Sequence, residues 1–187
     1  MAQNKIFGYG SLLSTASLQK TVPSPKALTP CYIQGFRRNF SFQREHREGI
    51  THFDASGPQF AALNVLPHTD PAAHVNGVLF DLSDEELAQL MEREHGYDML
   101  ETTTYDFVTH EPLGTCIVFS ANQEQEAFNY DAPGQLRYLQ ICLDGAREHG
   151  DTFYQTFITS TYVNGIPLHE ALQRLSGQPE LSLSLAS

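Results

Sequence analysis

The first half of the chain consists of short apolar runs that prolines and glycines separate, and no other feature constrains the fold as strongly. Short runs rich in strand-forming residues and bounded by turn residues are typical of β-strands. The predicted strands are residues 5–9, 32–42, 60–66, 75–82, 102–110 and 115–120. We therefore expect the first half of the chain to form mainly β-structure.

Helical signals dominate the last third of the chain and also occur before it. Ser83, followed three residues later by Glu86, is a capping-box sequence, and Gly96 suits the end of the helix that begins there. Ser14 is expected to cap a short helix that carries Leu18. Further helices are predicted at about residues 133–150, 153–165 and 167–175.

The length and the apolar content of the chain fit one domain. With 187 residues, 41% of them apolar, the chain can bury one substantial core and is too short to need two. We expect a single domain at residues 1–176 and a Ser/Leu-rich tail at 177–187, which either frays or adds an edge strand. No run approaches the roughly 18 apolar residues of a membrane-spanning helix, and the N-terminus lacks a secretory pattern, so the expected location is cytoplasmic.

The charge and the cysteines exclude some partners. Acidic residues outnumber basic ones by 22 to 11, and this excess repels nucleic acid and anionic membranes. The cysteines Cys31, Cys116 and Cys142 are far apart and form no CxxC pair, so we expect reduced, structural thiols.

One acidic residue lies on the helix face that should meet the core. In the helix after Ser83, the apolar face carries Leu87, Leu90 and Met91, and the next position of that face is Glu94. An inward carboxylate loses water and lies near the negative end of the helix dipole; both effects favour its protonated form, as a general base for neutral pH requires. Alternatively, the last turn frays and Glu94 reaches solvent or pairs with an arginine. The other charged residues of the helix are expected to be solvated: Glu85, Glu86, Glu92 and Arg93.

The segment after the first strand carries two glycines in alternate positions, Gly8 and Gly10. A strand, a glycine turn and a helix start expose backbone N–H groups to a carboxylate or an oxyanion. The segment is neither a dinucleotide fingerprint nor a P-loop, and Ser11 is not in a G-x-S-x-G elbow. A tight bend between closely packed backbones is the alternative interpretation.

The sequence gives little support for a metal site or for a cysteine or serine nucleophile. No two histidines have metal-ligand spacing on one element; His46 with His52, or His68 with His74, would have to meet through folding. The cysteines lie in apolar runs typical of buried, inert thiols. His95 is expected to be exposed, because adjacent helix residues point about 100° apart.

Three short motifs, in this order and spacing, resemble the ChaC-like branch of the γ-glutamylcyclotransferase-like superfamily. They are Phe7-Gly8-Tyr9-Gly10-Ser11-Leu12, Gly35-Phe36-Arg37-Arg38-Asn39-Phe40 and Arg93-Glu94-His95-Gly96-Tyr97-Asp98. The resemblance covers about residues 5–110. It implies an α+β fold in which a small, mixed β-barrel is flanked by helices.

The resemblance also implies an activity and a site. Such an enzyme converts a γ-glutamyl amide or peptide into 5-oxoproline and releases the amine, with no metal or organic cofactor. Glu94 would be the general acid/base, and Tyr9, Gly10, Ser11 and Leu12 would bind the γ-glutamyl group. Tyr97 is expected to line the pocket. Arg38 is expected either to orient Glu94 or to bind substrate.

One departure from the family pattern bears on the substrate. Where glutathione-specific members carry an Arg-Gly-Thr-Pro-type segment, residues 47–52 lack that proline pattern, which argues against glutathione. The leaving amine and the oligomeric state stay open. A non-catalytic module that binds a small molecule or a protein on the same scaffold is the alternative function.

Overall fold

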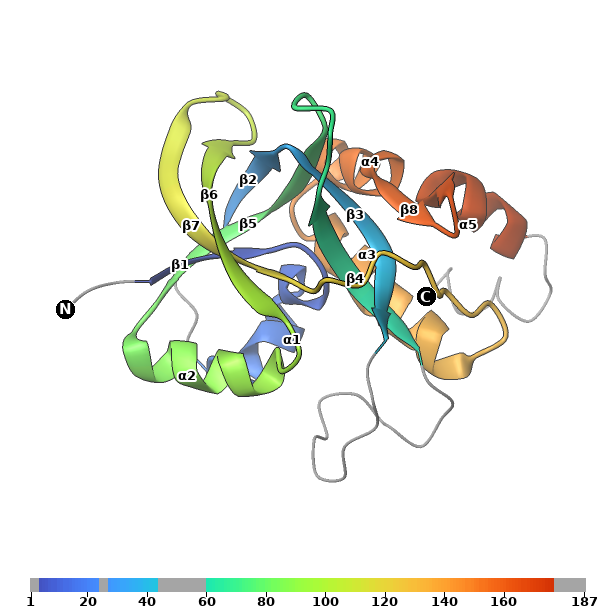
Figure 1. The fold of residues 1–187 in the computed structure, drawn as a ribbon, viewed down its shortest axis with the longest axis horizontal. Coiled ribbons are helices and arrows are strands. Elements are labelled where there is room, and N and C mark those ends of the chain that lie inside the picture. Colours follow the sequence, from blue (N-terminus) through green and yellow to red (C-terminus); the bar gives the residue numbers. More distant parts are fainter. Residues whose placement is uncertain (1–3, 24–26, 44–59, 177–187) are drawn as a thin grey trace.

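Five strands form a closed barrel in the computed structural model, which describes residues 4–23, 27–43 and 60–176 (Figure 1). Their order around the barrel is β1-β5-β2-β6-β7, and β7 closes on β1 in parallel. The barrel strands are β1 (Asn4–Gly8), β2 (Thr29–Gln34), β5 (His74–Leu82), β6 (Asp98–Asp106) and β7 (Pro112–Ser120). The expected α+β fold with a small, mixed barrel is confirmed.

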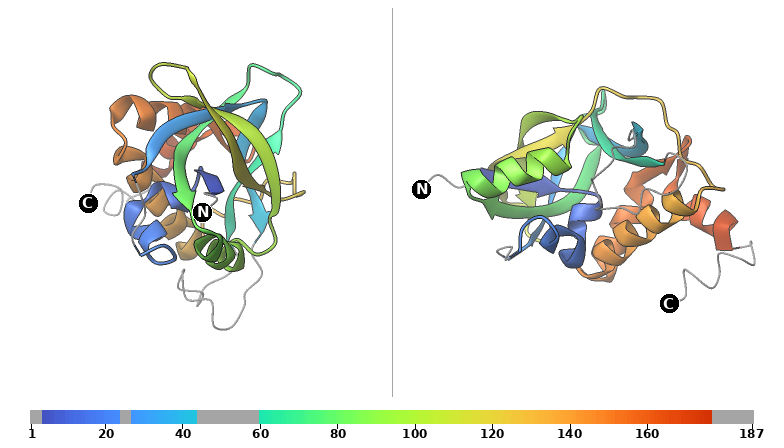
Figure 2. Two further views of the ribbon diagram at one scale, coloured as in Figure 1. Left: turned by 90° about the vertical axis from the view of Figure 1, so that its left-hand side faces the viewer. Right: turned by 90° about the horizontal axis from the view of Figure 1, so that it is seen from below.

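A second sheet lies beside the barrel, in the order β4-β3-β8-β9. Its strands are β3 (Phe36–Gln43), β4 (Ala61–Pro67), β8 (Thr161–Val163) and β9 (Ile166–Pro167). Helices α3 (Pro133–Arg147), α4 (Asp151–Ser160) and α5 (Leu168–Ser176) gather on the side of this sheet (Figures 1 and 2). Helix α2 (Asp84–Arg93) lies apart from them, against the barrel.

Gly35 sends the chain from the barrel into the second sheet. The single strand predicted at residues 32–42 is wrong, because Gly35 has φ +75° and separates β2 from β3. Glycine adopts this left-handed conformation without steric cost. Hydrogen bonds hold the bend on both sides: the Gly35 amide donates to the Ala73 carbonyl, and the His68 amide donates to the Gly35 carbonyl.

Helix α2 begins as predicted but buries a different face. Ser83 accepts from the Glu86 amide, and the Glu86 side chain accepts from the Ser83 amide, so the capping box is present. Leu90 is fully buried, but Met91 is 44% exposed, so the expected inward position of Met91 is wrong. Arg93, expected to be solvated, is buried. The buried stripe of the helix therefore runs through Leu90 and Arg93.

The remaining helices differ from expectation mainly at their ends. Ser14 caps the short helix α1 (Thr15–Gln19) as predicted, and a 3-10 turn, η1 (Ser11–Leu13), precedes it. Pro133 opens α3 as expected. The helix predicted to reach residue 165 ends at Ser160, and the chain then forms β8, which pairs with β3. The run of β-branched and aromatic residues at Thr161–Val163 favours a strand there.

One hydrophobic core links the barrel, the second sheet and the helices, from Ile6 to Leu175. All three cysteines are buried and free, as expected. Within the described ranges, no helix is long and apolar enough to cross a membrane. The tail at 177–187 lies outside the described residues, and the division at residue 176 stays a prediction.

Candidate functional site

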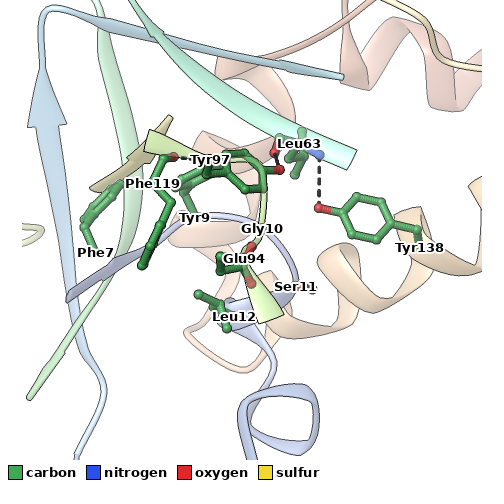
Figure 3. Close-up of a pocket in the computed structure, with 10 residues that line it drawn as sticks. All are labelled: Phe7, Tyr9, Gly10, Ser11, Leu12, Leu63, Glu94, Tyr97, Phe119 and Tyr138. Carbon is green, nitrogen blue, oxygen red and sulfur yellow. Dashed lines mark hydrogen bonds between the residues drawn. The ribbon is translucent and has the colours of Figure 1, made fainter. Parts of the chain in front are cut away.

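A pocket opens where the barrel, the second sheet and α3 meet, and it holds about 310 Å³ of space, counting the part open to solvent (Figure 3). Ligand sites are typically concave and mostly apolar, with a few converging polar groups. Its lining is aromatic and aliphatic apart from one carboxylate, Glu94, and one aliphatic hydroxyl, Ser11. The lining residues are Phe7, Tyr9, Gly10, Ser11, Leu12, Leu63, Glu94, Tyr97, Phe119 and Tyr138.

The segment after β1 forms one wall of the pocket. Gly10 precedes the 3-10 turn, in which the Leu13 amide donates to the Gly10 carbonyl at 3.0 Å and the Ser14 amide donates to that of Ser11 at 3.3 Å. The first amides of a helical turn have no acceptor within it. The N–H groups of Ser11 and Leu12 are therefore the donors that this turn leaves for another acceptor.

A side chain at Gly10 would be tightly confined. A Cβ atom there would lie 3.0 Å from the Tyr138 hydroxyl oxygen, which would have to shift by a few tenths of an ångström, and 3.4 Å from the Leu63 Cβ, an ordinary contact distance. The absence of a side chain at Gly10 therefore lets the wall pass directly beside Tyr138 and Leu63.

Glu94 lies at the end of α2 and lines the pocket. Its amide still donates to the Leu90 carbonyl, at 2.8 Å, but its backbone has left the helical conformation, so it is the C-cap rather than a residue of the last turn. The side chain is 12% exposed, and one carboxylate oxygen is 3.4 Å from Arg93 Nε. The carboxylate is thus inward, as the helical spacing predicted, and it also has an arginine neighbour, as the alternative interpretation held.

Three tyrosines fix the shape of the pocket through their hydroxyl groups. The Tyr9 hydroxyl donates to the Phe119 carbonyl at 2.5 Å, and the Tyr97 hydroxyl donates to the Leu63 carbonyl at 2.7 Å (Figure 3). The Tyr138 hydroxyl accepts from the Leu63 amide at 3.0 Å. These bonds tie the lining to strands β4 and β7.

Burial changes the acid–base behaviour of two of these tyrosines. It raises the pKa of Tyr9 and of Tyr138 well above the usual value, and the nearby charge of Glu94 adds to the increase. Both phenols therefore stay neutral over the physiological range. Among the lining residues, the carboxylate comes from Glu94.

Arg38 lies outside the pocket lining. Its guanidinium is fully buried and donates to the carbonyls of Tyr9 and Asn76 and to the side chains of Asn76 and Thr161. Its contact with the site is the Tyr9 carbonyl, at 3.2 Å. This arrangement assigns Arg38 to holding the backbone at the start of the pocket wall, and none of its hydrogen bonds within the described chain reaches Glu94.

The structure brings six of the seven predicted site residues into one pocket: Tyr9, Gly10, Ser11, Leu12, Glu94 and Tyr97. The seventh, Arg38, stands behind the wall. Sequence reasoning missed Tyr138, which reaches the site from α3, and Arg93. A signal for Arg93 existed, because position 93 follows Leu90 by three residues and so shares its helix face.

The described residues contain no cluster of side chains that could bind a metal ion. No group of three or more histidine, cysteine or acidic side chains there has the geometry to hold an ion. His95 is exposed, as expected. His46 and His52 lie outside the described residues, and so does the segment 47–52 that bears on glutathione.

A model of the family described as ChaC-like protein matches residues 5–145. This match spans the predicted motifs and also Tyr138, which lies beyond the part of the chain that carried the resemblance. A comparison with curated protein sequences returns no significant match.

Several solved structures share the fold at low sequence identity. An uncharacterized human protein, loc79017, is 18% identical with a TM-score of 0.63, over 92% of this chain and 99% of its own. A protein described as gamma-glutamyl cyclotransferase is 17% identical with a TM-score of 0.61, over the same shares. A yeast gamma-glutamyl cyclotransferase specific to glutathione is 15% identical with a TM-score of 0.51, over 100% of this chain and 95% of its own.

Proposed function

The chain belongs to the ChaC-like protein family, and from this premise we propose that it is a γ-glutamylcyclotransferase-type enzyme. In this proposal it converts a γ-glutamyl amide or peptide into 5-oxoproline and releases the amine. Glu94 is the general acid/base. The activity printed for two of the structural neighbours, gamma-glutamyl cyclotransferase, supports the reaction class.

One observation carries the proposal: Glu94 and the wall formed by Gly10, Ser11 and Leu12 line the same small pocket. A cyclisation needs a group that moves protons and a group that holds developing negative charge, close to one carbonyl. The carboxylate meets the first need, and the amides of Ser11 and Leu12, which have no acceptor within the 3-10 turn, meet the second. The aromatic remainder of the lining limits the contact of the substrate with water, which would compete as a nucleophile.

The chemistry is intramolecular. The α-amine of the γ-glutamyl group attacks its own side-chain carbonyl carbon, so that a C–N bond forms and closes the five-membered ring. Because the α-amine has an ordinary pKa of about 8, much of it is an ammonium group at neutral pH, and it first releases one proton to water to become the neutral nucleophile. As the new C–N bond forms, Glu94 takes a second proton from the attacking nitrogen. The amide C–N bond then breaks, and Glu94 gives that proton to the departing amine.

The backbone amides of Ser11 and Leu12 donate hydrogen bonds to an anionic group in this scheme. They would hold either the oxyanion of the tetrahedral intermediate or the α-carboxylate of the substrate, and loss of one such oxyanion donor typically costs about 3 kcal/mol of transition-state stabilisation. Tyr9 and Tyr97 serve as neutral walls, since their hydroxyl groups already donate to backbone carbonyls.

The test is the release of 5-oxoproline from a panel of γ-glutamyl substrates by the wild type and by Glu94→Gln. The panel contains glutathione, γ-glutamyl amino acids and γ-glutamyl amines. We expect the wild type to act on at least one member and the variant to lose about 10²- to 10⁴-fold in kcat, the usual contribution of general acid–base catalysis.

The matched control is Glu92→Gln, which makes the same change on an exposed residue of the same helix. It should retain wild-type turnover, and both variants should keep the wild-type circular dichroism spectrum. Equal turnover by Glu94→Gln and the wild type would remove Glu94 from the mechanism.

A non-catalytic binding module is the second candidate function. The pocket would then bind a γ-glutamyl compound without turnover, and calorimetric binding without product would favour that reading. The inward carboxylate argues against it, because an acidic side chain that is mostly buried lowers stability unless it has a task.

A further inference from the structure

Arg93 lies beside both halves of the proposed catalytic site. The residue is 3% exposed, although the charged end of an arginine side chain normally reaches water. Its Nη2 donates to the Ser11 hydroxyl at 3.1 Å, and its Nε is 3.4 Å from a carboxylate oxygen of Glu94. One guanidinium therefore contacts the pocket wall and the general base at the same time.

Three further hydrogen bonds anchor this guanidinium. Its Nη1 donates to the Ser17 carbonyl at 2.8 Å and to the Thr21 hydroxyl at 3.1 Å, and its Nη2 also donates to the Ser17 hydroxyl at 2.9 Å. Ser17 lies in α1, and Thr21 follows it. The planar fork of arginine is thus fixed at several corners, which a single ammonium group cannot reproduce.

We propose that Arg93 is a positioning residue that holds the Ser11 wall and the Glu94 carboxylate in one fixed relative geometry. The inference rests on the proposed function and extends it to a residue that does not line the pocket. Because the Ser11 oxygen accepts from Arg93, the hydroxyl proton of Ser11 is left to donate elsewhere, and Ser11 lines the pocket. Arg93 therefore orients Ser11 as a donor toward an anionic group of the substrate while it restrains the base.

The first test is Arg93→Lys, which keeps the positive charge and removes the fork. If Arg93 positions the site, kcat should fall by about 10- to 100-fold while KM changes by less than about 3-fold, since small displacements of reacting groups cost rate more than binding. The matched control is Arg147→Lys, because Arg147 forms an exposed ion pair with Asp144 at 3.0 Å. That variant should keep both constants within about 2-fold of the wild type.

A second pair of variants covers the case in which Arg93→Lys does not fold. Thr21→Val removes a hydroxyl that anchors the guanidinium from outside the pocket, and Thr21→Ser restores it. A positioning role predicts a several-fold lower kcat for Thr21→Val and recovery for Thr21→Ser, per folded molecule. Wild-type kcat in Arg93→Lys, or in Thr21→Val when Arg93→Lys is unfolded, would overturn the proposal.

A readout without turnover separates this proposal from the proposed function. Amide hydrogen exchange at residues 11–13 reports how firmly the pocket wall is held. Arg93→Lys, or Thr21→Val if the former is unfolded, should exchange there at least several-fold faster than the wild type, and Arg147→Lys should not. If the wild type turns over no substrate, the proposed function is wrong, but faster exchange in the variant still supports the positioning role of Arg93. Unchanged exchange in the variant refutes the positioning role.

Discussion

Arg38 is a buried cation in a setting of neutral oxygen atoms. Among the described residues, its hydrogen bonds go to carbonyl, amide and hydroxyl oxygens of Tyr9, Asn76, Phe157, Ser160 and Thr161, and its guanidinium also stacks on the Phe157 ring at 4.1 Å. Burial lowers the pKa of Arg38 from its ordinary value to about 9, which still leaves it charged at neutral pH. The residue therefore joins the end of β1 to β5, α4 and β8.

Arg38→Met should destabilise the protein because it leaves several buried acceptors without a donor. We expect the free energy of unfolding in urea to fall by about 3 kcal/mol, the range for unsatisfied buried polar groups. Arg37→Met is the control on the same strand, since Arg37 stacks on Tyr162 at 3.6 Å and should cost about 1 kcal/mol or less. Similar losses for the two variants would contradict the structural role assigned to Arg38.

At the residue scale, the sequence identified the groups that carry chemistry better than the groups that support them. Glu94 stood out because an acid continues an apolar helix face, and Gly10 stood out through its motif. Arg93 and Tyr138 were missed because their importance depends on partners far away in the chain, Ser11 for Arg93 and Leu63 for Tyr138. The spacing of Arg93 from Leu90 indicates that the side chain is buried, but local spacing carries no information about its partners.

Helix α3 supports the pocket wall from behind. Gly145 lets the helix approach the chain so closely that a Cβ atom there would lie 2.5 Å from the Ser14 amide nitrogen. At the end of the helix, the Glu148 carboxylate accepts from the Thr15 amide at 3.0 Å, and His149 Nε2 lies 3.0 Å from the Leu13 carbonyl oxygen. The position of the wall therefore depends on α3.

Gly145→Ala should push α3 away from the wall. The clash involves backbone atoms, which cannot rotate aside, so we expect a loss of about 1–3 kcal/mol in unfolding free energy and a lower kcat/KM. Gly134→Ala is the same change in the same helix, where the nearest atom beyond its neighbours would be 3.8 Å away. It should be neutral or stabilising by up to about 1 kcal/mol, because alanine favours helix. Equal effects at both positions would disprove the close approach.

At the element scale, the sequence predicted helix and strand ends correctly where residues close in sequence determine them. It failed where the end of an element depends on the strand with which it pairs. The capping box at Ser83 marks the start of α2 because both bonds are local. The segment predicted as one strand at residues 32–42 is rich in strand-forming residues throughout. The bend at Gly35 arises because its first part, β2, pairs with β5 in the barrel, whereas its second part, β3, pairs with β4 in the second sheet. Strand β8 was missed for a similar reason, since it follows α4 without a break and is defined by pairing with β3.

The whole molecule is needed to build the site. The lining combines side chains from the barrel, from the second sheet through Leu63 and from α3 through Tyr138. Most of these residues are also part of the hydrophobic core. Catalytic geometry and global stability are therefore coupled, and conditions that loosen the core should affect the pocket directly.

Alkaline pH should loosen this core. Burial raises the pKa of Cys31, Cys116 and Cys142 above the ordinary 9.0, to about 12 for the last two, and it raises the pKa of Tyr9 and Tyr138 above 10.0. Between the ordinary and the raised pKa, the unfolded chain binds fewer protons than the folded one, so stability falls as pH rises. Arg38 acts in the opposite direction, because its lowered pKa makes the folded chain bind fewer protons from about pH 9 upward.

The three thiols and two phenols lower stability as pH rises, and only Arg38 among the groups named here raises it. The unfolding free energy in urea should therefore decrease from about pH 8 to about pH 10, first through the thiols and then through the phenols. Each fully buried group contributes up to about 1.4 kcal/mol per pH unit in its window. Cys142→Ala removes one such group, so under reducing conditions its stability curve should be less steep than that of the wild type by up to this amount, whatever its stability at neutral pH. Parallel curves for the two proteins would mean that the Cys142 thiol ionises as easily in the folded chain as in the unfolded one, which is incompatible with its burial beside Tyr138 and Arg38.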